Sequence, residues 1–426
     1  MFSRSFVDDS EANRGGDGQP LVPACEQSSM ETTDAFAGLE CVDCGGSYDP
    51  ADVSHRCPDC DGFLDPTYDY DAIDLDRETL AARPFDSLWR YEELLPFTRE
   101  SAVTTNEGAT ALVDCPDLAD ELGIDRLLIK DEGRNPTGST TDRGLSVALT
   151  AASQHGASDV ALATTGNGGQ AAAAYAGRAG LESHSYVPSR SSFSNKAMIN
   201  VHGGDMNVVG GRYDDAVGAF EEGLAENDDW YSVQSFVMPY RHEGAKTTLY
   251  EIVEGLEWEV PDIVAYPTGV GVGLIGAYKA ATELRELGLV DDLPGLYAAQ
   301  ADGCAPIVDA FENGHDEHEP VETPDTICGE IEIADPPASA RVLEALAETD
   351  GGAVATEDRD ILEAAVQVAQ HEGLEMAPSP AAAASGVWEL AERGEFDGSE
   401  TVVIVNTASG NKEGDVLRSH LMSQGV

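Results

Sequence analysis

Residues 263–287 read IVAYPTGVGVGLIGAYKAATELREL, and this stretch contains the unit from which most of the chain is built. The apolar run at residues 263–265 predicts a buried strand, and residues 273–287 have the spacing of a helix. Between them lies the loop Pro267-Thr268-Gly269-Val270-Gly271-Val272-Gly273. Its glycines let the backbone turn tightly and approach a ligand, and the free amides of the following helix attract an anion.

The same alternation of strand and helix continues on both sides of this stretch. Apolar runs that predict buried strands lie at residues 126–129, 160–163 and 401–405. Segments with helical spacing lie at residues 144–155, 169–180, 214–225, 358–371 and 381–392. Strands that alternate with helices predict a doubly wound α/β fold, with parallel strands joined by crossover helices.

Two further loops follow predicted strands and resemble the first in composition. One reads Thr164-Thr165-Gly166-Asn167-Gly168-Gly169-Gln170, and the other reads Asn406-Thr407-Ala408-Ser409-Gly410. Loops at the carboxyl ends of parallel strands meet in one crevice, so all three should face the same space. Each loop alone could serve packing only. Together they predict a small anionic ligand, such as a phosphorylated one, held between two lobes.

Four cysteines have the spacing of a metal site. Cys41 and Cys44 form one CxxC knuckle, and Cys57 and Cys60 form a second one twelve residues later. Two such knuckles bring four thiolates to one point, which predicts a structural zinc ion. The alternative is two redox-active or disulfide-forming pairs, which a reducing cytoplasm disfavours. The other cysteines stand alone and are expected to pack as small apolar side chains: Cys25, Cys115, Cys304 and Cys328.

The charge of the chain is extreme. It has 426 residues, of which 79 are acidic and 24 basic, for a net charge of −55, and only five are lysines. Such a composition is typical of proteins that stay soluble in concentrated salt, where self-repulsion is screened. The absence of a basic patch argues against nucleic acid or an anionic membrane as partner. The sequence also lacks an apolar run of about 18 residues and a secretory signal pattern, so the cytoplasm is expected.

The domain organisation expected from composition has four parts. Residues 1–36 should be a disordered acidic tail, and residues 37–66 a zinc ribbon. Residues 67–105 form a connector that docks on the body through an aromatic and leucine segment. Residues 106–426 form the α/β body, in which a smaller lobe at about 140–235 is inserted into the larger lobe.

The order of many segments and the residues in them resemble those of the threonine synthase family, within the tryptophan-synthase-β-like group of fold type II pyridoxal-phosphate enzymes. The resemblance covers nearly the whole chain after about residue 39. Its segments are the four-cysteine ribbon, Leu88-Trp89-Arg90-Tyr91, Leu94-Leu95-Pro96, Glu107-Gly108, Lys130-Asp131-Glu132, Asn135-Pro136-Thr137-Gly138-Ser139, Asp142-Arg143-Gly144, Thr165-Gly166-Asn167, Pro239-Tyr240-Arg241, Glu243-Gly244, Lys246-Thr247, Tyr266-Pro267-Thr268-Gly269, Asn406-Thr407 and Ser409-Gly410.

The resemblance implies a role for each loop in holding pyridoxal phosphate and an amino-acid substrate. Asn167 would lie beside the ring hydroxyl, and Thr407, with Ser409, would face the pyridine nitrogen. Residues Gly269, Val270, Gly271, Val272 and Gly273 would surround the phosphate, and Ser139, Thr165 and Gly166 would receive a substrate carboxylate. Members of the family convert O-phosphohomoserine to threonine and phosphate, and close relatives deaminate serine or threonine. Family habit also implies a homodimer, or pairing with a paralogue.

The chain departs from the family pattern at the catalytic position. Thr141 stands where the family has the lysine that binds the cofactor and moves protons. Val270 and Val272 replace smaller or polar residues in the phosphate loop, and Pro378-Ser379-Pro380 replaces a family Pro-Glu-Gly. Three hypotheses remain open: an enzyme with a substitute base, for which Lys130 is the first candidate; a non-catalytic paralogue that binds an amino acid, a phosphorylated metabolite or free pyridoxal phosphate; and a zinc-ribbon scaffold for another protein.

Overall fold

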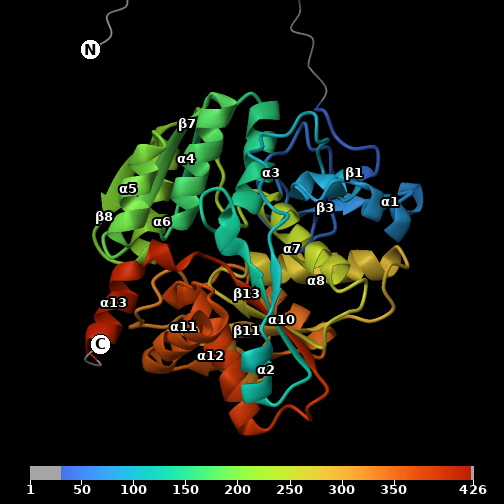
Figure 1. Cartoon of the computed structure of the whole chain (residues 1–426). Coiled ribbons are helices and arrows are strands. Elements are labelled where there is room, and N and C mark those ends of the chain that lie inside the picture. The colour runs from blue at the N-terminus through green and yellow to red at the C-terminus, as the bar shows by residue number, and fades with distance from the viewer. Residues whose placement is uncertain (1–29, 424–426) are drawn as a thin grey trace, which may run out of the picture.

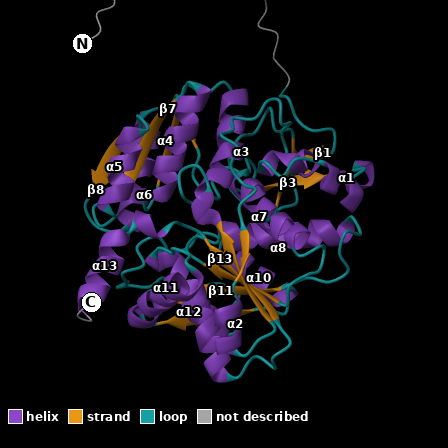
Figure 2. Ribbon diagram, in the orientation of Figure 1, coloured by secondary structure: helices purple, strands orange, loops and turns teal. Residues whose placement is uncertain are grey.

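The computed structural model describes residues 30–423, so most of the tail expected at residues 1–36, together with Cys25, lies outside the described residues. Three sheets organise the described chain: a small N-terminal sheet, a four-stranded sheet and a six-stranded sheet (Figure 1). Helices pack against both larger sheets (Figure 2). No described helix is long and apolar enough to cross a membrane.

The N-terminal sheet has the order β2-β1-β3, and the four cysteines lie at the end of β1 and in the segments between the strands. Both neighbours of β1 pair with it in antiparallel fashion. It is followed by a short helix and a 3-10 segment that leads into the body. These elements are β1 Phe36–Cys41, β2 Ser47–Tyr48, β3 Leu64–Tyr68, η1 Tyr70–Ala72, α1 Arg77–Ala82 and η2 Leu88–Leu94.

The six-stranded sheet has the order β12-β11-β10-β13-β5-β4, and only β4 runs antiparallel to its neighbour. Its central strands are mostly apolar and are buried along most of their length, because helices cover both faces. Helix α12 packs across β10–β13, and α8 and α10 pack against β11. The strands are β4 Leu112–Asp114, β5 Arg126–Asp131, β10 Ile263–Pro267, β11 Gly295–Ala301, β12 Gly352–Thr356 and β13 Thr401–Asn406.

The helices that accompany this sheet alternate with its strands, as expected for a doubly wound fold. They are α2 Pro116–Leu122, η3 Glu132–Arg134, α7 Arg241–Gly255, α8 Val272–Glu286, α9 Pro306–Asn313, α10 Ser339–Glu348, α11 Asp358–Glu372, α12 Pro378–Arg393, η4 Gly410–Lys412 and α13 Gly414–Ser423. The fold class predicted from the sequence is therefore confirmed for the described residues.

The four-stranded sheet is entirely parallel, with the order β8-β7-β6-β9. It lies beside the larger sheet, in the green part of Figure 1, and its helices include α4, α5 and α6. The elements are α3 Thr141–Gln154, β6 Asp159–Ala163, α4 Asn167–Ala179, β7 Glu182–Pro188, α5 Phe193–Val201, β8 Asp205–Val209, α6 Tyr213–Glu226 and β9 Trp230–Ser232.

A buried network of charges joins the N-terminal sheet to helices α7 and α8. Asp65 of β3 accepts from His242 at 2.6 Å and from Lys279 at 2.8 Å, and Lys279 also lies 2.6 Å from Glu243. Asp65, His242 and Glu243 have the ligand types of a metal site. The Lys279 amine already supplies the positive charge among them, so this group is an ion-pair network. It anchors the ribbon on the two helices that border the main cavity.

Candidate functional site

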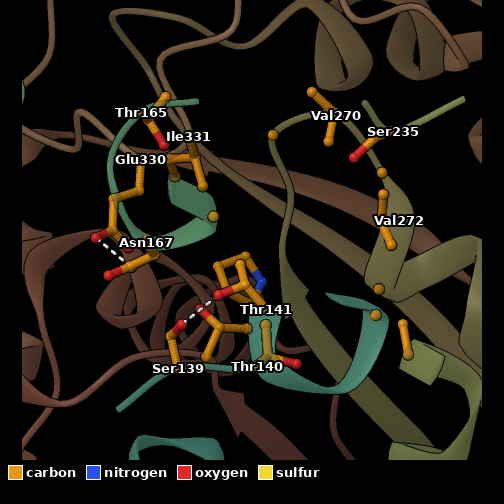
Figure 3. A pocket seen from close by; sticks show the side chains of 18 of the residues that line it. Ser139, Thr140, Thr141, Thr165, Asn167, Ser235, Val270, Val272, Glu330 and Ile331 are labelled. Atoms are coloured by element: carbon orange, nitrogen blue, oxygen red, sulfur yellow. Dashed lines mark hydrogen bonds between the residues drawn. The ribbon is translucent and has the colours of Figure 1, made fainter. Parts of the chain in front are cut away.

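One cavity, of about 180 Å³, brings the three predicted loops together (Figure 3). The loop after β6 contributes Thr164, Thr165, Asn167 and Gly168. The loop after β10 contributes residues 267–273, and Thr407 comes from the loop after β13. The cavity thus lies between the two larger sheets, at the carboxyl ends of their parallel strands, where the topology predicts a ligand.

The glycine loop before α8 borders this cavity, and the first amides of a helix are free to bind an anion. Gly271 precedes the helix with a φ of +91°, and a Cβ there would lie 2.5 Å from Val342 Cγ2. Only glycine fits this position, because the backbone is left-handed and closely packed. Val270 and Val272 both line the cavity, so the loop also contributes apolar side chains to it (Figure 3).

Arg241 adds a buried positive charge to the wall. It is 8 % exposed, stands at the start of α7 and lines the cavity. Its Nη1 donates to the carbonyl of Val233 at 3.1 Å, its Nε is buried without a partner, and no carboxylate within the described chain pairs with it. Burial lowers the pKa of Arg241 to about 10, so the side chain stays cationic at neutral pH. A buried cation without a counter-ion requires an anion to offset its desolvation.

Asn167 and Glu330 form a polar wall in another part of the cavity. The side-chain amides of Asn167 and Asn195 both donate to Glu330 Oε1, the second at 3.2 Å. Figure 3 shows Glu330 directed at Asn167 from a loop that has no regular secondary structure. Burial raises the pKa of Glu330, while the charge of Lys412 and the two amides oppose this shift.

Thr141 lies at the cavity at the first turn of α3. Its hydroxyl and that of Ser139 are 2.6 Å apart, and both residues line the cavity (Figure 3). The amide of Thr140 donates to the carbonyl of Thr407 at 2.8 Å, and Ser139 forms an antiparallel bridge with Ala408. The loop after β13 therefore fixes the segment that contains Thr141.

Three of the residues singled out from the sequence do not line the cavity. Ser409 donates its amide to the carbonyl of Gly138 at 3.0 Å, and this bond helps to hold the loop after β13 against the segment that precedes Thr141. Gly166 is close to the cavity, but a Cβ on it would lie 2.7 Å from Cβ of Asn195. Lys130 is fully buried, and its amine contacts Glu251 Oε2 at 2.6 Å and the carbonyl of Thr110 at 2.8 Å.

Sequence reasoning gave no site role to Arg241 or Glu330. Arg241 was visible within the Pro239-Tyr240-Arg241 segment, and its missing counter-ion appears only in three dimensions. Glu330 lies in an irregular loop far along the chain from Asn167, and no local pattern marks it.

The thiols of Cys41, Cys44, Cys57 and Cys60 lie within 4.8 Å of one another. Cys41 Sγ is 3.5 Å from Cys60 Sγ, and Cys44 Sγ is 3.7 Å from Cys57 Sγ. This compact set of soft ligands fits a tetrahedral zinc ion, which remains a proposal.

We expect the purified protein to contain one zinc ion per chain, and Cys44→Ser to lose it. Because a structural zinc site contributes directly to folding, loss of the metal should lower the unfolding temperature. Metal analysis and thermal unfolding in concentrated salt measure both effects. Cys115→Ser, at a buried cysteine outside the cluster, is the control that should keep the metal. Metal-free protein with an unchanged unfolding temperature would contradict the zinc site.

Comparison with known proteins decides the family. The model of the family described as "Pyridoxal-phosphate dependent enzyme" matches residues 103–408. A threonine synthase from Methanosarcina acetivorans is 37% identical over 370 residues, which are 87% of this chain and 90% of that protein. The chain belongs to the threonine synthase family. A second member, threonine synthase from Methanocaldococcus jannaschii, is 36% identical over 88% of this chain and 93% of its own length.

Solved structures support the fold of this threonine synthase family member. A fungal L-serine ammonia-lyase from Rhizomucor miehei superposes with a TM-score of 0.65 at 21% identity, over 75% of this chain and 99% of that one. Maize serine racemase gives a TM-score of 0.64 at 16% identity, over 77% and 98% of the two chains. At such identities the likeness concerns the fold alone.

The cavity fits only part of what the family cofactor, pyridoxal phosphate, requires. The glycine loop and Arg241 suit its phosphate, and the buried Oδ1 of Asn167 has no hydrogen-bond partner and could serve its ring substituents. No lysine lines the cavity, however, so the residues present offer no amine for covalent attachment of the aldehyde. The site therefore fits a non-covalently bound anion and does not fit a Schiff base.

Proposed function

We propose that this member of the threonine synthase family binds a small anionic ligand without the covalent cofactor chemistry of the family. The ligand would be a phosphorylated amino acid, a related metabolite or free pyridoxal phosphate. The observation that carries the proposal is that Thr141, which the resemblance puts at the position of the family lysine, lines the cavity, whereas no lysine does.

The chemistry of threonine supports this reading. A hydroxyl forms no stable imine with an aldehyde and is a poor base near neutral pH. In this protein the Thr141 hydroxyl is also hydrogen-bonded to Ser139 at 2.6 Å. Thr141 can therefore orient a ligand or donate one hydrogen bond to it, but it cannot replace an amine.

All five lysine amines have other partners. Lys130 forms a buried ion pair with Glu251, and Lys246 forms buried ion pairs with Glu243 and Glu283. Lys279 pairs with Asp65 and Glu243. Lys196 donates to the carbonyl of Ser189 at 2.7 Å, and Lys412 donates to Gln170 Oε1 at 2.6 Å. A substitute Schiff base at Lys130 would require breaking a fully buried ion pair. The substitute-base hypothesis is thus less favoured than binding without turnover.

Arg241 is expected to dominate anion binding. Replacing it with glutamine should weaken binding of inorganic phosphate and of O-phospho-L-homoserine by roughly tenfold to a hundredfold, because a charge-assisted hydrogen bond is lost. Calorimetric titration in one concentrated-salt buffer measures the change. Arg126→Gln, at an exposed arginine paired with Asp114, is the matched control and should bind as wild type does.

Two results would contradict the proposal. Equal affinities for wild type and Arg241→Gln would mean that the cavity is not the anion site. Turnover of O-phospho-L-homoserine by the wild-type protein with pyridoxal phosphate would restore the enzymatic hypothesis. Pairing with a second copy or with a paralogue stays a prediction, which the mass of the protein in solution tests.

A further inference from the structure

Glu330 places an acidic side chain in a cavity whose other features favour an anion. It lines the cavity together with Ile331, while Arg241 lines it from α7. A site for a purely anionic ligand gains nothing from a carboxylate, because like charges repel in a medium of low dielectric constant. An acidic and a basic side chain on one cavity therefore favour a ligand that carries both signs.

The hydrogen bonds of Glu330 leave one of its oxygens available. Asn167 and Asn195 both donate to Oε1, which fixes the orientation of the carboxylate. Within residues 30–423, no donor hydrogen-bonds to Oε2. Lys412 acts on Glu330 only at longer range, since its amine bonds to Gln170 Oε1 at 2.6 Å and forms no ion pair with Glu330.

Further acceptors near Glu330 also lack donors. The side-chain oxygens Oδ1 of Asn167 and Asn195 are buried and have no hydrogen-bond partner, and these residues are only 5 % and 1 % exposed. Asn167 lines the cavity and Asn195 lies behind Glu330, so this side of the cavity has more acceptors than donors. An ammonium group carries three donors and no acceptor, which suits such a wall.

The absence of a lysine at position 141 explains why an ammonium needs this wall. Where no lysine–cofactor bond exists, the amine of a bound amino acid has no such bond to replace, so it stays protonated near neutral pH. A charge that is moved from water into a cavity must be paired and hydrogen-bonded there. Arg241 and the loop before α8 can pair the anionic end, but they repel the ammonium end.

We propose that Glu330 is a specificity-determining residue that binds the free ammonium group of a zwitterionic ligand, while Arg241 binds its anionic group. This inference rests on the proposed function and deepens it, because it selects amino acids over ligands that are only anionic. Asn167 and Asn195 act as positioning residues that direct the carboxylate.

The test compares two ligands that differ only in the amine. O-phospho-L-homoserine carries the ammonium group, and 4-(phosphonooxy)butanoate is the same molecule without it. Wild-type protein should bind the first roughly tenfold to a hundredfold more tightly than the second in calorimetric titrations. Glu330→Gln should remove this difference by weakening the first ligand, and it should leave the affinity for 4-(phosphonooxy)butanoate unchanged or improved. An unchanged thermal unfolding curve verifies that the variant is folded.

The outcomes separate this inference from the function on which it rests. If wild type binds both phosphorylated ligands equally, or if Glu330→Gln keeps the preference for the amine, Glu330 does not bind ammonium, although the anion site stands. If neither these ligands nor inorganic phosphate bind to wild type, the proposed function itself is wrong. The wild-type comparison needs no variant, so a misfolded Glu330→Gln protein would not leave the question open.

Discussion

Replacing Thr141 with lysine is expected to create a covalent pyridoxal-phosphate adduct that the wild-type protein does not form. Residue 141 lines the cavity at the first turn of α3, beside the glycine loop and Asn167 that would hold the cofactor. A lysine there gains an amine in a partly desolvated site, which favours the neutral nucleophilic form. After borohydride reduction, peptide mapping should find the adduct at position 141 in the variant and no adduct in wild type.

The matched control for this experiment is Ser153→Lys, which adds a lysine at an exposed position of the same helix. It should give no specific adduct, since an exposed amine stays protonated and lacks the phosphate loop nearby. A reduced adduct on Lys130 or Lys412 of wild type would contradict the assignment and support catalysis with a substitute base. Failure of the Thr141→Lys variant to form an adduct, while folded, would mean that the cavity no longer accepts the cofactor.

The second large effect is expected on stability, at the buried charge cluster behind the cavity. Arg143 lies 2.6 Å from Glu132 Oε2 and 2.6 Å from Glu251 Oε1, and Lys130 lies 2.6 Å from Glu251 Oε2. All four side chains are 0–1 % exposed. Glu251→Gln leaves two buried cations short of one counter-charge, so the free energy of unfolding should fall by about 3–5 kcal/mol. Denaturant unfolding in a fixed concentration of salt measures the change.

Asp114→Asn is the control for Glu251→Gln, since it breaks the exposed ion pair with Arg126, whose side chains are 65% and 41% exposed. Its effect should stay below about 1 kcal/mol. Equal effects of the two substitutions would show that the buried cluster contributes no more than a surface pair.

The buried charge cluster should also make the free energy of unfolding depend on pH in the acidic range. Burial alone would raise the pKa of Glu251, but the charges of Arg143 and Lys130 outweigh burial and lower it to about 2 from the ordinary 4.5. Because the folded-state pKa is depressed, this carboxylate contributes stability above pH 4.5 that is lost as the pH falls toward 2. The Glu251→Gln variant should lose this part of the acid dependence.

The fold was predictable where the interior is apolar. Strands β5, β6, β10 and β13 follow apolar runs, and each forms within about one or two residues of the predicted bounds. Helix α12 begins at Pro378, earlier than expected, because proline is tolerated in the first turn of a helix. The periodicity of apolar residues did not predict elements in which charged side chains are buried or apolar side chains are exposed. Helix α7 is buried along most of its length although it carries Glu243, Lys246 and Glu251, whereas β8 has no buried residue.

The site was predictable to the extent that strand ends converge. The three loops were expected in one crevice because parallel strands end at the same edge, and the structure places them there. The charges of the cavity were not predictable. Whether Arg241 has a counter-ion depends on how the lobes are arranged, and whether Glu330 faces Asn167 depends on the path of an irregular loop. Neither the arrangement of the lobes nor the path of the loop produces a periodic pattern in the sequence.

The burial of the lysine side chains also determines how the native protein should react with amine-directed reagents. Lys130 and Lys246 are fully inaccessible, Lys412 is 5 % exposed, and the side chain of Lys279 is 11% exposed. Acylating reagents and amine cross-linkers should therefore modify few lysines other than Lys196 as long as the protein is folded. Rapid labelling of the other four would instead report that the chain has opened, which makes lysine acylation a direct probe of unfolding in concentrated salt.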